Sequence, residues 1–565
     1  MKLVECVPNF SEGRDLAKIN TITDVISGVD GITILDVDPG ADTNRTVVTF
    51  IGNPEAVSEA AFLGIKTAAE VIDMSKHKGA HARLGATDVC PFIPIANVSD
   101  DECIDLSKSV GKRVGEELRI PIYLYEKSAQ KLDRLKLPTI RRGEYEGLQE
   151  KLKDENWKPD FGPVEFNSGA GATVMGMRDF LIAYNINLNT KDQRLATDIA
   201  FELRESGRSK RIPNPNSPNL LDGEIVRNTD GSPVKVPGLF KDVKGVGWYI
   251  DTFKRAQISI NFNNYKVSTI HNVFDAACKL ADERGIRVTG SELVGLIPLD
   301  AILMAGKHYL QKQGRTIGVP ESDIIESAVQ SLGLNDVTPF VPEEKIIEYA
   351  VGKKSGKLIS LSVGGFTNEL STNSPAPGGG SVAALAGSLG AALSSMVAAL
   401  THEKKGFESQ KSEMDMIGQD AQIIKDRLAF LVDEDTRAFN NVMAANRLPA
   451  IDDAEKTMKD DAILKANQYA IDVPFEVATL CYSIIQLADV LVSKGNPNSV
   501  SDAEVAAEVA LAGVRGAAMN VLINLPGVAD GDYCEEKRKN INKLIEKAEA
   551  KHDLVFGKTI AVIDS

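Results

Sequence analysis

Cysteine, tryptophan and histidine are all scarce in this chain of 565 residues, which has six cysteines, two tryptophans and six histidines. The cysteines lie far apart, and no two of them form a CxxC pair: Cys6, Cys90, Cys103, Cys278, Cys481 and Cys534. Such spacing is typical of reduced, buried thiols and argues against a disulfide framework or a cysteine-based zinc site. We therefore expect neither disulfides nor a bound metal.

The chain also lacks an excess of positive charge. It has 64 lysines and arginines against 79 aspartates and glutamates, a net charge of −15. This balance makes nucleic acid or an anionic membrane an unfavourable partner for the whole chain, although local basic patches remain possible. The first residues, MKLVECVPNFSEGRD, do not contain the apolar core of a signal peptide, so we expect a cytoplasmic protein.

Long hydrophobic runs are rare as well. The exception is SVAALAGSLGAALSSMVAAL, residues 381–400, which is long enough to cross a membrane and carries no charge. It consists mainly of alanine, glycine and serine, whose small side chains favour close packing between helices. We therefore predict a buried helix of a bundle and no membrane span.

The order of patterns along the chain predicts a multi-domain protein with two kinds of architecture. Up to about residue 340, strand-like runs such as GITILDVD and AQISINF alternate with helical patterns such as QRLATDIAFELRESG, which is typical of an α/β fold. Residues 211–238 interrupt it with Pro, Asn, Asp and Gly and indicate an inserted loop or hairpin. Beyond residue 341, long segments of 3.6-residue period predict an all-α helical bundle.

The segment SKHKGAHARLGATDVCPFIP, residues 75–94, holds His77 and His81 four residues apart. This spacing occurs in zinc proteases, but Gly79 interrupts the helix and no acidic third ligand is near in the sequence. A structural histidine in a loop is a second interpretation. The third is a proton-transfer residue in an anion-attracting pocket, since Lys76, Lys78 and Arg83 flank the pair.

A second stretch of interest is NSPAPGGGSVAAL, residues 373–385, where three glycines precede a predicted helix. The bare amides at a helix N-terminus can bind an anion or a carbonyl oxygen. The stretch has no GK[ST] of a P-loop and no preceding strand, so an ordinary turn remains an alternative.

Three adjacent acids in LVDEDTRAF form the third candidate, and helix geometry separates them. Asp435 falls on an apolar stripe with Leu431, Val432, Ala438 and Phe439. Asp433 instead meets Arg437 four residues on, which predicts a solvated face. Burial would raise the pKa of Asp435 toward the range useful for general acid catalysis, unless it is simply paired at the edge of the bundle.

These motifs together resemble the formimidoyltransferase-cyclodeaminase family. The resemblance rests on VECVPNFSEGRD, DVDPGADTNRTVVTFIG, SKHKGAHARLGATDVCPFIP, PDFGPVEFNSGAGATV and GSELVGLIP in the first half, and on SPAPGGGSVAALAGSLGAAL, LVDEDTRAF and NVLINL in the second. It implies two α/β subdomains, residues 1–182 and 183–336, with a tetrahydrofolate cleft between them and the insertion at about 211–238 in the second. The helical cyclodeaminase domain is then residues 337–565.

The resemblance implies a bifunctional, folate-dependent enzyme of histidine degradation. It would transfer the formimidoyl group between N-formimidoyl-L-glutamate and tetrahydrofolate, and would convert 5-formimidoyltetrahydrofolate to 5,10-methenyltetrahydrofolate and ammonia. The expected partners are folate, with or without a polyglutamate tail, and L-glutamate, and the family suggests a homo-oligomer. Two alternatives stay open: a helical half that acts as a methenyltetrahydrofolate cyclohydrolase, and a non-catalytic folate-binding scaffold.

The resemblance also implies roles for individual residues. His81 would be the proton-transfer residue of the transferase, with Asp38 as a partner that orients or charges the imidazole, and Asp435 would be the acid of the cyclodeaminase. The folate-contacting residues would be Gly162, Pro163, Val164, Glu165, Phe166, Asn167, Ser168, Gly169, Ala170 and Gly171 in the first half. In the second half they would be Gly378, Gly379, Gly380 and Ser381. His77 has no implied role.

Overall fold

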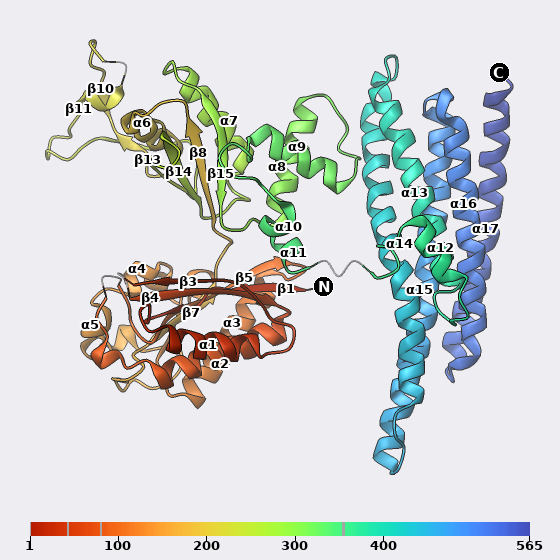
Figure 1. Cartoon of the computed structure of the whole chain (residues 1–565), viewed down its shortest axis with the longest axis horizontal. Helices are drawn as coiled ribbons and strands as arrows, with labels where there is room; N and C mark the ends of the chain where they lie inside the picture. Colours follow the sequence, from red (N-terminus) through yellow and green to blue (C-terminus); the bar gives the residue numbers. More distant parts are fainter. Residues whose placement is uncertain (1, 42–43, 80–81, 218, 353–355) are drawn as a thin grey trace. The chain divides into compact units, whose positions relative to one another are not determined.

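A computed structural model of the chain describes residues 2–41, 44–79, 82–217, 219–352 and 356–565 (Figure 1). The chain divides into two compact units that are interleaved along the sequence. The first unit comprises Met1–Ala301 and Leu332–Lys353, and the second comprises Ile302–Ser331 and Lys354–Ser565. The first is α/β and the second is helical, so the predicted fold class is confirmed. The domain boundaries at 182 and 336 remain predictions.

The first sheet of the α/β unit has the strand order β1-β4-β2-β5-β7-β6, with β3 paired to β4. Its strands are β1 (Leu3–Cys6), β2 (Asn9–Phe10), β3 (Thr33–Gly40), β4 (Arg45–Gly52), β5 (Thr87–Ala96), β6 (Ile122–Leu124) and β7 (Thr173–Met177). All pairings are antiparallel except β5 with β7 and β6 with β7. One face carries the larger core under α1 (Leu16–Ser27), α2 (Pro54–Val71) and α3 (Asp100–Glu117) (Figure 1). A smaller core includes residues of α4 (Leu137–Ile140) and α5 (Glu144–Lys151).

The second sheet is fully antiparallel, with the order β13-β14-β8-β15. Its strands are β8 (Ile182–Leu188), β13 (Val243–Ile250), β14 (Arg255–Phe262) and β15 (Val288–Val294), and α6 (Gln193–Leu203) and α7 (Ile270–Asp282) pack against it. The predicted insertion forms two short antiparallel ladders: β9 (Arg208–Ser209) with β12 (Lys235–Val236), and β10 (Arg211–Ile212) with β11 (Glu224–Ile225). The short helices α10 (Pro342–Lys345) and α11 (Ile347–Ala350) also belong to this unit.

Five long helices form the second unit: α13 (Gly379–Glu403), α14 (Lys411–Asn446), α15 (Asp453–Lys494), α16 (Val500–Asn524) and α17 (Gly531–Ile563). The shorter α12 (Val363–Leu370) precedes them. The segment 302–331, which holds most of α8 (Leu299–Lys312) and α9 (Glu321–Leu332), belongs to the same unit. Hydrogen bonds attach this segment to the bundle. Asp415 of α14 accepts from Thr316 Oγ1 at 2.5 Å and from the Ile317 amide at 2.8 Å.

Small residues allow the helices of this bundle to approach closely. A Cβ atom on Gly387 of α13 would lie 2.5 Å from the Cys481 Sγ of α15, and one on Gly513 of α16 would lie 2.6 Å from the same sulfur. One on Gly390 would lie 2.8 Å from the Ala506 carbonyl oxygen. The Cys481 side chain and the α16 backbone therefore occupy the space that larger side chains would need. Residues 381–400 form a helix of a bundle, as predicted, and 56% of its apolar window is buried.

Three segments in the described part of the chain are long and apolar enough to cross a membrane: Gly379–Glu403, Asp453–Lys494 and Pro497–Gly527. About half of each apolar window is buried inside the protein, 56%, 44% and 50% respectively. The absence of a membrane span therefore stays a prediction, and the packing of these helices against one another supports it.

Candidate active sites

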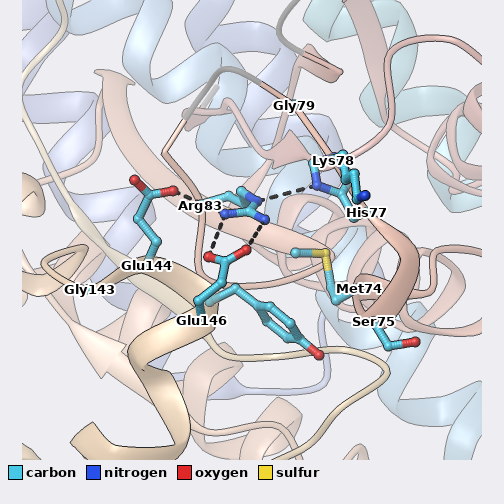
Figure 2. A pocket seen from close by; sticks show the side chains of 10 residues that line it. Met74, Ser75, His77, Lys78, Gly79, Arg83, Gly143, Glu144 and Glu146 are labelled. Carbon is cyan, nitrogen blue, oxygen red and sulfur yellow. Dashed lines mark hydrogen bonds and ion pairs between the residues drawn. The ribbon is translucent and has the colours of Figure 1, made fainter.

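The first candidate site is a cavity of about 680 Å³ in the α/β unit (Figure 2). Its described lining comes from the segment after α2 and from the start of α5: Met74, Ser75, His77, Lys78, Gly79, Arg83, Gly143, Glu144, Tyr145 and Glu146. His81, the predicted proton-transfer residue, lies outside the described residues. The lining nevertheless includes Gly79 and Arg83, which are each two positions from His81 in the sequence.

A network centred on Arg83 organises one wall of this cavity. Figure 2 shows its guanidinium between His77 and two glutamates: Nε donates to His77 Nδ1 at 3.3 Å, and Nη2 donates to Glu146 Oε1 at 2.6 Å. Nη1 donates to both Glu144 and Glu146, at 3.0 and 2.8 Å. The hydrogen bonds and charge of Glu146 raise the pKa of Arg83, and Arg83 in turn lowers the pKa of Glu146.

The same network determines the tautomer of the His77 ring. Its Nδ1 accepts from Arg83, so its Nε2 carries the proton and donates to the Asn44 carbonyl oxygen at 2.9 Å. The Asn44 side chain ties the segment further, since Nδ2 donates to the Lys78 carbonyl oxygen at 3.0 Å and Oδ1 accepts from the Gly13 amide at 3.0 Å. Both ring nitrogens of His77 are therefore occupied, which fits a structural histidine that holds the loop.

The expected excess of positive charge around this loop is not present in the described lining. Arg83 is neutralised by its two glutamates, and Lys76 forms an ion pair with Asp73 at 2.8 Å. Lys76 is not among the described residues that line the cavity, whereas Lys78 is. The sequence could not reveal this because Glu144 and Glu146 are some 60 positions away from Arg83.

The predicted folate-contacting segment, residues 162–171, packs beside the cavity. The Met74 amide donates to the Gly169 carbonyl oxygen at 2.9 Å, and the Tyr145 hydroxyl donates to the Ser168 carbonyl oxygen at 2.6 Å. The rings of Tyr145 and Phe166 are 5.4 Å apart. The first and last glycines of the segment have positive φ, +82° at Gly162 and +70° at Gly171, a conformation that other residues rarely adopt. The structure thus brings this segment and the His77 loop together.

Asp38 is placed differently. It is exposed on β3, where it pairs with Val47 of β4, and it is not among the described residues that line the cavity. Its charge acts on Arg45: burial lowers the pKa of Arg45, while the carboxylates of Asp88 and Asp38 act in the opposite direction. Its partnership with His81 remains a prediction.

A second cavity, of about 450 Å³, is lined by residues from both sheets of the α/β unit, including Glu5 of β1, Thr49 of β4, Ala183 of β8 and Val294 of β15. Glu5 is buried, and burial raises its pKa to about 7, against an opposing effect of Arg178. Such a carboxyl exchanges protons near neutral pH. Sequence reasoning missed this residue, because Glu5 lies in a short strand, LVEC, whose other residues are apolar and carry no catalytic signature.

In the helical unit, the structure brings together two predicted motifs that are 54 residues apart. The Ser381 hydroxyl lies 3.2 Å from Asp435 Oδ2 and 2.8 Å from the Val432 carbonyl oxygen. A Cβ atom on Gly380 would lie 2.0 Å from Asp435 Oδ1, so the carboxyl packs directly on this glycine. Burial raises the pKa of Asp435, and hydrogen bonds from Ser381 oppose that shift. The arrangement presents a carboxyl with an elevated pKa at the start of α13.

Asn520 lies beside the contact between Asp435 and Gly380. It was not identified as a site residue from the sequence. A Cβ atom on Gly379 would lie 3.5 Å from Asn520 Nδ2, which places the amide of α16 against the glycines. Asn520 is the first residue of NVLINL, so its membership of a motif was the signal that could have found it.

The prediction for Asp433 was wrong, and the structure adds the environment of Glu434. Asp433 does not lie on a solvated face with Arg437, because its carboxylate accepts hydrogen bonds from the Leu358 and Ile359 amides at 2.8 and 3.0 Å. Arg437 pairs with Glu434 instead, at 3.1 Å, and the buried Glu434 also accepts from the Tyr469 hydroxyl at 2.7 Å. Residues from α15 and from the segment before α12 cover parts of α14 that its own sequence pattern predicts to be exposed to solvent.

Two separate regions that each hold acid–base groups, one on an α/β unit and one on a helical unit, define a two-part enzyme. Three family models match the chain in the same order: the formiminotransferase domain, N-terminal subdomain, over residues 3–178, the formiminotransferase domain over 183–352, and formiminotransferase-cyclodeaminase over 362–543.

Individual relatives agree with this order. The formimidoyltransferase-cyclodeaminase of Rattus norvegicus is 42% identical over 559 residues, which cover 98% of this chain and 98% of its own. The glutamate formimidoyltransferase of Thermoplasma acidophilum is 40% identical over 332 residues, 58% of this chain and 98% of its own. The methenyltetrahydrofolate cyclohydrolase of Methylorubrum extorquens is 36% identical over 191 residues, 34% of this chain and 92% of its own. This chain belongs to the formimidoyltransferase-cyclodeaminase family, which confirms the resemblance seen in the sequence.

Proposed function

We propose that this chain catalyses both reactions of its family in histidine degradation. In the first, the formimidoyl group passes between N-formimidoyl-L-glutamate and tetrahydrofolate. In the second, 5-formimidoyltetrahydrofolate cyclises to 5,10-methenyltetrahydrofolate and releases ammonia. The observation that carries the proposal is the contact of Asp435 with Gly380 and Ser381 in the helical unit, separate from the cavity beside residues 162–171 in the α/β unit.

The helical site suits the second reaction. Cyclisation needs N10 of the folate to attack the formimidoyl carbon, and the nitrogen that leaves as ammonia must gain a proton. A carboxyl with a raised pKa retains its proton at higher pH than an ordinary aspartic acid and can donate it to that nitrogen. Ser381 holds the carboxyl in place, and the absence of a side chain on Gly380 leaves room for it.

The α/β site suits the first reaction. Transfer between two amines moves a proton across a tetrahedral carbon, which a near-neutral imidazole can do. We assign this step to His81, with His77, Arg83 and Asn44 holding the preceding part of the loop. The positive φ of Gly162 and Gly171 allows the predicted folate-contacting segment to keep its backbone exposed to a flat pterin ring.

The similarity to a methenyltetrahydrofolate cyclohydrolase supports a second candidate for the helical unit, the addition of water to 5,10-methenyltetrahydrofolate. The two candidates differ in their products. Incubation of the full chain with 5-formimidoyltetrahydrofolate should release ammonia in step with the rise of methenyltetrahydrofolate absorbance. Absence of ammonia would exclude the cyclodeaminase and favour the cyclohydrolase.

Two variants of the full chain separate the active sites. His81→Ala should abolish glutamate-dependent transfer and leave ammonia release intact, and Asp435→Asn should do the reverse. Equal loss of both activities in either variant contradicts two independent sites. Folate binding without turnover in the unmodified chain would instead identify a scaffold.

We also propose that the protein is a cytoplasmic homo-oligomer without nucleic-acid partners, in line with the acidic composition and the family.

A further inference from the structure

A cluster of two glutamates and a histidine joins α16 to α17, at positions to which neither proposed reaction assigns a role. Glu504 and Glu508 are one turn apart on α16, and His552 projects from α17. One ligand-type atom of each residue lies within 4.8 Å of the others. His552 Nε2 is 3.2 Å from Glu508 Oε1 and 3.7 Å from Glu504 Oε1.

The cluster is buried on one side, and two of its polar atoms make no hydrogen bond within the described chain. Glu504 and His552 are only 9% and 7% exposed. Within the described chain, Glu504 Oε1 and His552 Nε2 have no hydrogen-bond partner, and both atoms point into the cluster. Buried polar atoms without partners are costly and rare in folded proteins. Their convergence on one point indicates a missing ligand that accepts lone pairs from carboxylate oxygen and imidazole nitrogen.

We propose that Glu504, Glu508 and His552 bind a divalent transition-metal cation of the zinc type. A tetrahedral ion with bonds of about 2.0–2.1 Å holds its ligand atoms about 3.3 Å apart. The two measured separations, 3.2 and 3.7 Å, bracket that value. One imidazole and two carboxylates form a ligand set that suits zinc better than calcium or magnesium, which prefer oxygen ligands alone.

The surroundings support the three ligands. The Thr559 hydroxyl donates to Glu504 Oε2 at 2.9 Å, which leaves Oε1 for the ion. Asp553 Oδ1 lies 3.8 Å from His552 Nδ1, on the side where a carboxylate favours the tautomer whose Nε2 is free to coordinate. Two nearby lysines of α17, Lys551 and Lys558, are neutralised by Asp489 of α15.

Glu508 provides the entry. Its side chain is 53% exposed, so the ion can reach the site from solvent, and a water molecule can fill the fourth position. A bound ion would have a structural role, because it would link α17 to α16. Asn520, which contacts the Asp435 corner, lies 16 residues along α16 from Glu504, or about 24 Å along the helix axis. Metal removal is therefore expected to affect the stability of the helical unit before its chemistry.

The test uses the full chain, stripped with a chelator and then titrated with zinc chloride in a calorimeter. We expect one high-affinity zinc ion per chain and a rise of several degrees in the Tm of the helical unit. Glu508→Gln, which changes a half-exposed side chain and should fold normally, should weaken binding at least tenfold. His552→Asn should abolish it. Cobalt chloride is a second probe, since tetrahedral cobalt absorbs strongly in the visible range.

Glu535→Gln is the control, because Glu535 is an exposed glutamate of α17, the helix that carries His552, and lies outside the cluster. It should bind zinc as the unmodified chain does, and ammonia release should be unchanged in both glutamine variants. The proposal is overturned if the stripped chain binds no zinc, or if Glu508→Gln and His552→Asn retain the affinity of Glu535→Gln. The first outcome would leave the cluster as three side chains packed together without an ion.

Discussion

Gly380 is the residue whose size most directly controls the helical active site. A methyl group there would lie 2.0 Å from Asp435 Oδ1, so Gly380→Ala must displace the carboxyl. We expect ammonia release to fall roughly a hundredfold, as for a misplacement of about 1 Å at a reacting group. Transfer to glutamate should be unchanged. Alanine favours helix over glycine, so the loss cannot come from a weaker helix. Rates of both reactions on the purified variant provide the measurement.

Gly379→Ala is the matched control for this prediction. The added methyl group would meet only Asn520 Nδ2, at an ordinary 3.5 Å. Although Gly379 is itself a predicted folate contact, ammonia release should fall only a few-fold, far less than in Gly380→Ala. If the two alanine variants lose activity equally, the packing of Asp435 on Gly380 is not what limits the reaction.

Glu5 makes stability depend on pH in the α/β unit. Its pKa is about 7 in the folded chain against 4.5 for an ordinary glutamate, so the folded state holds the extra proton between these values. The free energy of unfolding therefore falls as pH rises from 4.5 through 7, by about 3 kcal/mol in all. Glu5→Gln cannot ionise and should not show this loss. Thermal unfolding of both proteins across this pH range measures the difference.

The gap in Tm between Glu5→Gln and the unmodified chain should widen in favour of the variant as pH increases. Glu55→Gln, which alters a glutamate on the surface of α2, should follow the unmodified chain at every pH. A constant gap for Glu5→Gln would show that Glu5 is ionised throughout this range.

Single residues could be predicted where local geometry decides their surroundings. Asp435 could be isolated because its neighbours on α14 are apolar, and the structure places it against Gly380. The environment of Asp433 could not be predicted correctly, because its carboxylate accepts from the Leu358 amide, 75 positions away in the chain. Arg83 was misjudged for the same reason, since Glu144 and Glu146 reach it from another element.

At the scale of elements, α15 continues through a proline, which the sequence pattern did not predict. The helix begins at Asp453, and Pro474 lies in its interior. Proline has no amide hydrogen, so the carbonyl oxygen of Ala470, four residues earlier, loses its helical partner. Asn524 Nδ2 of α16 donates to that oxygen at 2.8 Å and replaces the missing bond. The side chain of one helix thus stabilises an interruption in another.

A double-mutant cycle tests this replacement. Asn524→Ala leaves the Ala470 oxygen without its donor and should lower the free energy of unfolding by about 1 kcal/mol. In a Pro474→Ala background the helix restores its own bond, so the same change should have little effect. The coupling is measured from urea unfolding of the four proteins. Equal effects of Asn524→Ala in both backgrounds would contradict the proposed replacement.

Elements with a strong period could be predicted from the sequence, and short or interrupted ones could not. The runs GITILDVD and AQISINF overlap β3 and β14, and the pattern QRLATDIAFELRESG contains α6. The start of α15, DAEKTMKDD, is mainly charged, so this part of the helix depends on the length of the helix and on capping by Asp452 more than on an apolar stripe. The two-residue strands of the insertion have no period to detect.

At the scale of the whole molecule, the described structure does not divide where the sequence texture changes. The texture changes near residue 341, but residues 302–331 already belong to the helical unit. Asp415 accepts from Thr316 and Ile317, and the Ser395 hydroxyl donates to the Gly318 carbonyl oxygen at 3.1 Å. Because residues 302–331 belong to the helical unit and residues 332–353 belong again to the α/β unit, no single boundary along the sequence separates the two units.

This interleaving predicts how fragments of the helical unit behave. A fragment of residues 337–565 lacks the partners of Asp415 and Ser395 and exposes the face of Gly418, which Gly318 covers at close range. A fragment of residues 299–565 keeps them. Loss of three hydrogen bonds and of this packing should cost about 2–4 kcal/mol, so the Tm of the shorter fragment should be roughly 5–10 °C lower. Both fragments contain Asp435 and Gly380, so ammonia release per folded molecule should be equal at low temperature. Equal Tm values would show that residues 302–331 do not contribute to the stability of the helical unit, and the boundary predicted at 336 would then describe the folding unit better than the contacts do.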